Sequence, residues 1–447
     1  MGKKIIVAGA GHGGITAAAL LAQSGFDVTV YERGEKDKLG YDWTDIFDPK
    51  ALDVVGCPRP SEDKFEWKID MTFFGPHTDD KHKIRQRVPN DPDQMEIKME
   101  RRDIYELIID FAEKNGVKLE YGVNILAPHM ESERVVGIET DKGVFLGDMV
   151  IDAAGAESPL RTQLPDSLGI QKHPVWGEKF YVYRAFYDLP LDPDTVEDKY
   201  KVMLLPEEGQ IGICWVATED DFSDLLIGRM DPFDEEEAER AANEFRKTNP
   251  QLGTKRIRGG QMVEIPVRQP LSVLVADGYA AIGDSAFMTV PIIGSGIGNA
   301  IKNSKLLAEA IIAAEDENYS AEALWSYQKA YYKTMGAGIA PLAAVKLLLT
   351  RISREQLDFA IDKGILTHHE MTITANHTSL WKFVNFDWKL PLRGIALLGD
   401  MDLTKKGIRV VKDVIKIIKI CKKMPDTYER EAVIEWAEKY DEIFTAK

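Results

Sequence analysis

A glycine-rich turn near the N-terminus limits most strongly what this chain can fold into. Residues 4–8 form an apolar run typical of a buried parallel strand, and Gly9, Gly11 and Gly14 follow it in the spacing GxGxxG. In such a turn the first glycine permits the sharp reversal into a helix, the second lets a pyrophosphate approach the backbone, and the third allows close helix–strand packing. The turn therefore predicts a strand–helix–strand unit that binds a dinucleotide at the N-terminus of its helix.

An acidic residue follows this unit at the distance that ribose recognition requires. The second apolar strand, residues 27–31, ends at Glu32, which lies about 20 residues beyond the glycines. A carboxylate at that place accepts hydrogen bonds from both ribose hydroxyls, so FAD or NAD fits better than NADP, whose 2′-hydroxyl is phosphorylated. The adenosine end of FAD or NAD is therefore the predicted ligand of this turn.

Two later segments distinguish between those two cofactors. Each combines an apolar strand with a glycine turn: residues 149–161 turn at Gly155, and residues 278–286 turn at Gly283 and Asp284. FAD is long and extended, so its ribityl chain needs a hydrogen-bond acceptor from a separate strand, which Asp284 can supply. An NAD dehydrogenase has no need for this second set. The three turns together predict FAD.

A glycine-rich helix entrance follows the last of these turns and suits the flavin end of FAD. Beyond Pro291, Gly294 and Gly296 precede a long helix that includes Ile297. The isoalloxazine ring needs a close backbone and a helix N-terminus near N1 and O2, where negative charge gathers on reduction. This entrance can supply both.

These motifs resemble the FAD-dependent oxidoreductases of the para-hydroxybenzoate hydroxylase superfamily over roughly residues 1–330. Within it, the chain resembles the geranylgeranyl reductase-like branch, because residues 299–302 continue the helix with Asn-Ala-Ile-Lys, and Ala-Ile-Lys is typical of that branch. The resemblance implies that Arg33 follows the ribose-binding acid and that Arg101 meets the FAD pyrophosphate, with Arg102 as the alternative. The predicted FAD-binding residues are Gly9, Gly11, Gly14, Glu32, Arg33, Arg101, Gly155, Gly283, Asp284, Pro291, Gly294, Gly296 and Ile297.

The resemblance implies an α/β fold, α+β overall, with a Rossmann-like FAD-binding domain, an inserted β-sheet substrate domain and a C-terminal helical region. The aromatic residues 179–187 indicate a strand of the inserted domain, and residues 234–247 indicate a helix with an acidic start. We expect the FAD-binding domain to comprise residues 1–60, 100–170 and 271–330, the substrate domain residues 61–99 and 171–270, and the helical region residues 331–447.

These motifs do not identify the catalytic residues. In the superfamily the segment after the Glu-Arg pair folds back over the flavin, so Tyr41, Asp42 and Trp43 are candidates to contact the ring; an ordinary loop anchored by Trp43 is the alternative. Tyr41, Asp42 and Tyr183 are candidate proton donors, since a hydroxyl or carboxyl group must lie within hydrogen-bond reach of the substrate. The middle turn has Ala154 where the hydroxylases have aspartate, which argues against their standard use of NAD(P)H.

Composition and charge disfavour several functional classes. The net charge of −17 argues against nucleic acid as a partner, because phosphate binding needs a basic surface. The 3 cysteines lie far apart, which disfavours a disulfide framework and a zinc or iron–sulfur site, so we expect no metal. No stretch of about 20 apolar residues could span a membrane, and we expect a cytoplasmic protein.

A basic amphipathic segment, residues 405–423, stands out in this acidic chain. Ile408, Val411, Ile415 and Ile418 share one helical face, and the lysines lie largely elsewhere. Two interpretations stay open: a helix that lies on an anionic membrane surface or binds an acidic partner, and a packed helix with solvated lysines. The first would place the protein peripherally at the inner membrane face and would suit a lipid-like substrate.

The sequence therefore predicts an FAD-dependent oxidoreductase that reduces carbon–carbon double bonds of an apolar, isoprenoid-like small molecule by hydride transfer from flavin N5. One alternative is an aromatic hydroxylase that uses NAD(P)H and oxygen. Another is an electron-transfer flavoprotein, although that family usually adds a cysteine-rich cluster domain. The external reductant is NAD(P)H or a donor protein such as ferredoxin. These motifs do not specify the substrate, the donor, the proton source or the oligomeric state.

Overall fold

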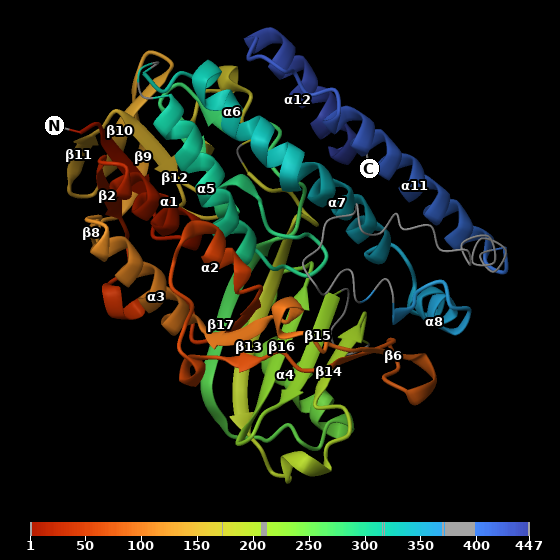
Figure 1. The fold of residues 1–447 in the computed structure, drawn as a ribbon. Helices are drawn as coiled ribbons and strands as arrows, with labels where there is room; N and C mark the ends of the chain where they lie inside the picture. The colour runs from red at the N-terminus through yellow and green to blue at the C-terminus, as the bar shows by residue number, and fades with distance from the viewer. Residues whose placement is uncertain are drawn as a thin grey trace.

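The computed structural model describes residues 2–171, 173–206, 212–314, 316, 318–368, 371 and 398–445. An α/β half and a second, mainly antiparallel sheet lie against each other, and the C-terminal helices run along one side of the molecule (Figure 1). This arrangement confirms the predicted fold class: a Rossmann-like unit, an additional β-sheet and C-terminal helices.

Six strands form the sheet of the α/β half. Five of them run parallel in the order β19-β12-β1-β2-β8, and β18 pairs antiparallel with β19 at one edge. All side chains of β12 are buried, as expected for a parallel strand that is covered on both faces. The strands are β1 Lys4–Ala8, β2 Asp27–Tyr31, β8 Lys118–Glu120, β12 Met149–Asp152, β18 Val275–Ala276 and β19 Tyr279–Ala281.

Helices cover one face of this sheet, and a three-stranded antiparallel sheet lies against the other (Figure 1). Helix α1 packs closely against α5. A Cβ at Gly13 of α1 would lie only 3.0 Å from the carbonyl oxygen of Ala300, so glycine at this position permits the close packing. The elements are α1 His12–Gln23, α2 Lys50–Val55, α3 Arg101–Lys114, α5 Ile297–Ala313, β9 Ile125–Glu131, β10 Arg134–Thr140 and β11 Gly143–Leu146.

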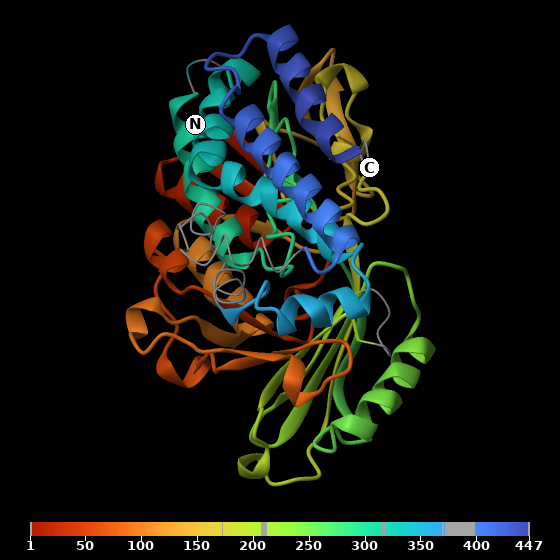
Figure 2. The same cartoon turned by 90° about the vertical axis from the view of Figure 1, so that its right-hand side faces the viewer.

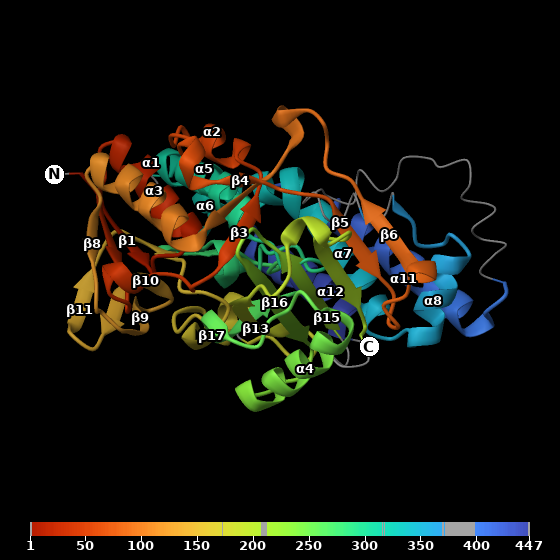
Figure 3. The same ribbon diagram turned by 90° about the horizontal axis from the view of Figure 1, so that it is seen from below.

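Seven strands form the second large sheet, in the order β17-β13-β16-β15-β14-β5-β6; all neighbours are antiparallel except β14 and β5. The predicted aromatic strand is present as β13, and its side chains alternate. Helix α4 lies against one face of this sheet (Figure 3). Tyr183 and Tyr187 face α4, whereas Val182 and Arg184 face the opposite side. The elements are β5 Met71–Phe74, β6 Lys83–Gln86, β13 Lys179–Asp188, β14 Tyr200–Leu204, β15 Gly212–Thr218, β16 Phe222–Arg229, β17 Arg256–Pro266 and α4 Glu235–Thr248.

A small antiparallel sheet links the two halves. It consists of β3 Thr44–Phe47, β7 Ile97–Glu100 and β4 Glu66–Trp67 in the order β3-β7-β4, and β7 leads directly into α3. Strand β3 comes from the predicted FAD-binding part of the chain, and β4 and β7 come from the predicted substrate part. The domain boundaries stay a prediction, and this sheet is where the two parts interleave.

The described C-terminal residues are helical, and residues 372–397 of the predicted helical region lie outside the described residues. Helix α11 packs against α7 and α12. Among the described residues, no single helix combines the length and the apolar composition needed to cross a membrane; the segments Ala321–Leu349 and Arg354–Asp362 meet both criteria only as a pair bent by 113°. The helices are α6 Ala321–Tyr331, α7 Ala337–Leu349, α8 Arg354–Asp362, α11 Met401–Cys421 and α12 Arg430–Thr445.

Candidate active site

Three glycine turns meet at the carboxyl ends of β1, β12 and β19, in the parallel sheet where β12 lies between the other two. Gly9 has a φ of +91°, and a Cβ there would lie 2.7 Å from the carbonyl oxygen of Ala153, so the first and middle turns are in contact. The middle and last turns are joined by a 2.9 Å hydrogen bond from the Gly155 N–H to Ser285 Oγ. The sheet thus brings together three segments that are remote in the sequence.

The N-terminus of α1 has the features of an anion site. Among the described residues no side chain caps this helix at Gly11, and its first turn contains no acidic residue. Its backbone N–H groups and positive dipole end are therefore available to a phosphate. Glu32 lies beside this helix end, where its Oε2 accepts a 2.8 Å hydrogen bond from the Ala10 N–H and its Oε1 accepts one of 2.7 Å from the Gly34 N–H. Arg33 is exposed.

His12 also lies at this helix end and was not singled out by the sequence pattern. Its ring centroid is 4.5 Å from that of Tyr105 on α3. Burial, assisted by the charge of Arg101, lowers the pKa of His12 to about 3, so the imidazole is neutral. Its Nε2 is buried and makes no hydrogen bond within the described part of the chain. A neutral ring with an unsatisfied nitrogen beside a helix N-terminus fits a site for a polar ligand.

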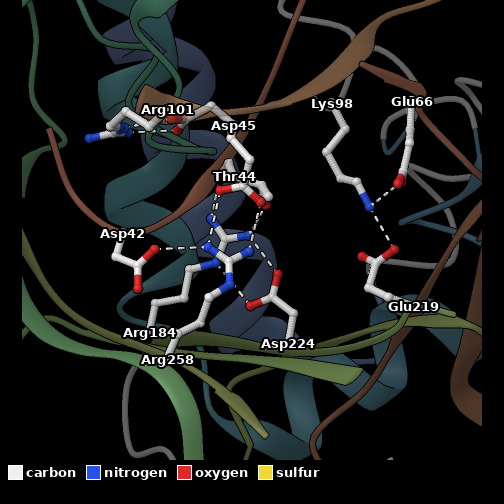
Figure 4. A network of polar contacts seen from close by, with 11 residues as sticks. Asp42, Thr44, Asp45, Glu66, Lys98, Arg101, Arg184, Glu219, Asp224 and Arg258 are labelled. Atoms are coloured by element: carbon white, nitrogen blue, oxygen red, sulfur yellow. Dashed lines mark hydrogen bonds and ion pairs between the residues drawn. The ribbon is translucent and has the colours of Figure 1, made fainter. Parts of the chain in front are cut away.

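Arg101 extends from the start of α3, and its guanidinium contacts Asp45 of β3 at 2.5 and 2.6 Å (Figure 4). It also lies over the rings of Tyr41 and Trp43, 5.0 and 5.5 Å from their centroids. Arg102, the alternative considered from the sequence, is exposed. The sequence pattern missed Asp45, because only the pairing of β3 with β7 brings it next to Arg101.

Asp284, in the last of the three turns, lies beside the entrance to α5. Asp284 Oδ1 accepts a 2.7 Å hydrogen bond from Thr289 Oγ1. A Cβ at Gly296 would lie 2.6 Å from the same Thr289 oxygen, so only glycine permits this approach of α5. Pro291 is buried. Among the described residues no side chain caps α5, and its first turn contains no acidic residue, which leaves a second helix N-terminus open to partial negative charge.

A cavity of about 210 Å³ lies between the segment that leads into α5 and the seven-stranded sheet. The start of α5, residues 294–297, borders one side of the cavity, and strands of the seven-stranded sheet border the other. Charged side chains reach it from Asp45, Lys68, Arg101 and Arg184, but most of the lining is apolar. The apolar lining includes Phe73, Val182, Val202, Trp215, Leu226 and Ile293.

A network of ion pairs holds the walls of this cavity together (Figure 4). Arg184 of β13 is buried, pairs with Asp224 of β16 at 2.9 and 2.5 Å, and donates a 2.5 Å hydrogen bond to the Thr44 carbonyl oxygen of β3. Arg258 of β17 contacts Glu100, at the end of β7, at 2.7 Å. These contacts fix the small sheet against the large one. The network also contains Arg258–Asp42, Lys98–Glu66 and Lys98–Glu219.

The structure places the sequence-based catalytic candidates in different environments. Trp43 is buried and lines the cavity, and Tyr41 lies beside it with ring centroids 5.1 Å apart. Asp42 belongs to the ion-pair network described above. Tyr183 points away from the cavity, because its hydroxyl donates a 2.6 Å hydrogen bond to Glu239 of α4 on the opposite face of the sheet. Tyr200, which no sequence pattern singled out, lines the cavity instead.

Comparison with known proteins agrees with this geometry. Residues 7–56 match the family model of an NAD(P)-binding Rossmann-like domain. The chain is 21% identical to the digeranylgeranylglycerophospholipid reductase of Sulfolobus acidocaldarius, with 99% of this chain and 97% of the relative covered. It superposes with a TM-score of 0.72 on a geranylgeranyl bacteriochlorophyll reductase-like protein from Thermoplasma acidophilum, at 19% identity over 90% of this chain and 99% of that one. A probable FAD-dependent monooxygenase from Pseudomonas aeruginosa superposes with a TM-score of 0.59, at 19% identity over 81% of this chain and 99% of that one.

The chain is an FAD-dependent oxidoreductase, and it is similar in sequence and fold to members of the para-hydroxybenzoate hydroxylase superfamily. This FAD-dependent oxidoreductase resembles the geranylgeranyl reductase-like branch, as the motifs predicted. The predicted cofactor and enzyme class are thereby confirmed. The individual contacts between its residues and FAD stay predictions.

Proposed function

We propose that this oxidoreductase reduces carbon–carbon double bonds of an apolar, isoprenoid-like small molecule. The observation behind the proposal is the cavity, which has mainly apolar walls and borders the start of α5. Apolar walls stabilise a bound hydrocarbon chain by about 0.8 kcal/mol for each CH₂ group that they bury. The name of the Sulfolobus relative, a reductase of a digeranylgeranylglycerophospholipid, supports a substrate of this class.

The proposed cofactor site runs along the carboxyl ends of β1, β12 and β19, where the three glycine turns meet. In this proposal the N-terminus of α1 and Arg101 hold the pyrophosphate, Glu32 binds the ribose, Asp284 binds the ribityl chain, and the start of α5 meets the isoalloxazine ring. When bound there, FAD supplies the hydride from N5. In the same proposal the remaining predicted contacts also bind FAD: Gly9, Gly11, Gly14, Arg33, Gly155, Gly283, Pro291, Gly294, Gly296 and Ile297.

Tyr200 is the proton donor in this proposal. It lines the cavity, and its ring packs edge-on to that of Trp215 with ring centroids 6.0 Å apart. Burial raises the pKa of Tyr200, and the charge of Asp224 acts in the same direction, so the phenol keeps its proton at neutral pH. A neutral hydroxyl on the cavity wall can give that proton to a substrate carbon as the hydride arrives at the neighbouring carbon.

A flavin monooxygenase that uses NAD(P)H and oxygen is the second candidate. The shared fold of the Pseudomonas monooxygenase is the observation in its favour. Ala154 argues against it, since the hydroxylases have aspartate at this position. The third candidate, an electron-transfer flavoprotein, finds no specific support among the described residues.

The proposal has two finer parts. The electron donor is NAD(P)H or a protein such as ferredoxin, and no feature of the described residues distinguishes them. The substrate is delivered from a membrane, which the protein contacts peripherally through residues 405–423. A lipid-like substrate partitions into bilayers, so an enzyme that acts on it gains from peripheral contact.

Anaerobic reduction of the purified flavoprotein tests the function. NADH, NADPH and reduced ferredoxin are compared as donors, and the reduced protein is then mixed with a polyprenyl alkene or with oxygen. We expect the alkene to reoxidise the flavin and to gain two hydrogen atoms per flavin, measured by absorbance and mass spectrometry. Formation of an oxygenated flavin together with no reaction of any alkene would favour the monooxygenase instead.

A further inference from the structure

Helix α11 packs with one apolar face and leaves a second apolar face in solvent. The packed face includes Leu403, Ile417 and Cys421, which are buried. The second face contains Ile408 and Val411, which are 52% and 58% exposed. The sequence pattern identified this second face but could not say where it points. Ile418, the fourth residue of the predicted face, packs against the protein, so α11 is a packed helix that leaves the rest of this face in solvent.

A row of cations flanks the exposed apolar face. At about 100° per residue, Lys405, Lys412 and Lys416 lie within a quarter turn of Ile408, and all three lysines are exposed. Ile415, 46% exposed, extends the apolar face along the helix. Long cationic side chains beside an apolar stripe suit the boundary between lipid headgroups and acyl chains, where the stems lie on hydrocarbon and the ammonium groups reach phosphate.

This helix also adjoins the wall of the cavity. Val414 and Ile418 of α11 pack into the same apolar cluster as Ile292 and Ile293, and both of those isoleucines line the cavity. The helix lies on the outer surface of the molecule in two perpendicular views (Figure 1, Figure 2). One side of α11 therefore contacts residues of the cavity wall, and its other side presents the exposed apolar face.

We propose that α11 lies flat in the interface of an anionic lipid bilayer, with Ile408, Val411 and Ile415 inserted among the acyl chains. The net charge of −17 would repel such a membrane from most of the surface, so the basic helix selects one orientation. In that orientation helix α11 lies between the lipid and the part of the cavity wall that Ile292 and Ile293 form. The membrane contact stands on the surface of α11 alone, whereas its use for substrate entry rests on the proposed function.

Co-sedimentation of the flavin-loaded full chain with vesicles tests the contact. Vesicles of phosphatidylcholine alone are compared with vesicles that also contain phosphatidylglycerol, at low and high salt. We expect binding only to the anionic vesicles and a weaker interaction at high salt. The double variant Ile408→Ser, Val411→Ser should weaken binding by about tenfold or more, because each serine removes an inserted apolar group.

The matched control replaces two exposed apolar residues far from α11. Val144 and Leu146 of β11 are 51% and 53% exposed, and Val144→Ser, Leu146→Ser should bind the vesicles like the unchanged protein. Retained flavin in each variant shows that the fold is intact.

Equal binding by all three proteins, or no binding by the unchanged protein, overturns the proposal. A change from dimer to monomer in the α11 variant, without a change in vesicle binding, would instead identify a surface between two copies of the chain. Binding without any alkene turnover would leave the membrane contact standing and reject only the proposed substrate.

Discussion

Two walls of this molecule differ in what they are made of. The cofactor wall consists of the three glycine turns and the N-termini of α1 and α5, and the substrate wall consists of the strands of the seven-stranded sheet that line the cavity. On the cofactor wall, glycine turns and the N-termini of α1 and α5 present backbone groups, and a Cβ at Gly11 would already lie 2.9 Å from the carbonyl oxygen of Ala153. On the substrate wall, side chains such as Tyr200 and Arg184 project from separate strands of the large sheet. A wall of backbone tolerates only glycine at fixed spacings, which leaves a pattern in the sequence. A wall of side chains leaves none, because many residue types fit a half-buried strand.

The largest expected effect comes from breaking the cofactor wall at Gly11. In Gly11→Val the new side chain would occupy the approach of the pyrophosphate to the α1 N-terminus, and we expect FAD affinity to fall by about 100-fold or more. Flavin content after purification and titration with FAD measure this loss. Gly407→Ala is the control, since a Cβ there meets no atom within 4 Å. Full flavin content in Gly11→Val would contradict the assignment of this turn to the pyrophosphate.

On the substrate wall, we expect the loss of an ion pair to lower the stability of the fold. Arg184→Met leaves the Asp224 carboxylate buried without its cation, which we expect to lower the free energy of unfolding by about 3–5 kcal/mol. Chemical denaturation measures the change. The double variant Arg184→Met, Asp224→Asn should recover part of the loss, because the unpaired charge is gone. A single variant as stable as the unchanged protein would show that the ion pair does not hold the cavity wall.

The Tyr200→Phe variant should affect one half-reaction, reoxidation of the flavin by the alkene, and leave the other, reduction of the flavin by the donor, unchanged. Loss of the proposed acid leaves flavin binding and flavin reduction by the donor unchanged, and slows reoxidation by the alkene by about 100-fold. Stopped-flow absorbance measures the two half-reactions separately. Tyr183→Phe is the matched control, since that hydroxyl faces α4 rather than the cavity. Equal rates for Tyr200→Phe and the unchanged protein would remove Tyr200 as proton donor.

The smallest expected effect is a pH dependence of the free energy of unfolding, caused by His12 on the cofactor wall. The pKa of His12 is lowered from 6.5 to about 3 in the folded chain, so the unfolded chain binds the extra proton first as the pH falls. The contribution of His12 to stability is therefore complete above pH 6.5 and declines between pH 6.5 and about 3. Between pH 7 and pH 5 the FAD-free protein should lose about 1–2 kcal/mol more stability than the His12→Gln variant. Denaturation curves at both pH values measure the difference, and parallel losses in the two proteins would refute the prediction.

The sequence alone determined the fold class, the cofactor and the enzyme class, because each depends on local backbone requirements. A turn at Gly9 with positive φ, a carboxylate at Glu32 and a glycine-rich helix entrance at Gly296 are each encoded within a few residues. Their meeting at one sheet edge follows from the rule that parallel strands share the direction of their carboxyl ends.

Tertiary structure alone decided which side chains share the cavity and which face of α11 is exposed. Asp45 meets Arg101 only through the register of β3 with β7. The position of each side chain on the large sheet decides that Tyr183 points away from the cavity and that Tyr200 lines it. In α11 two apolar faces compete for the core, since Ile417 and Ile408 are equally hydrophobic. Periodicity identifies an apolar face, but only the position of the neighbouring helices decides whether that face is buried.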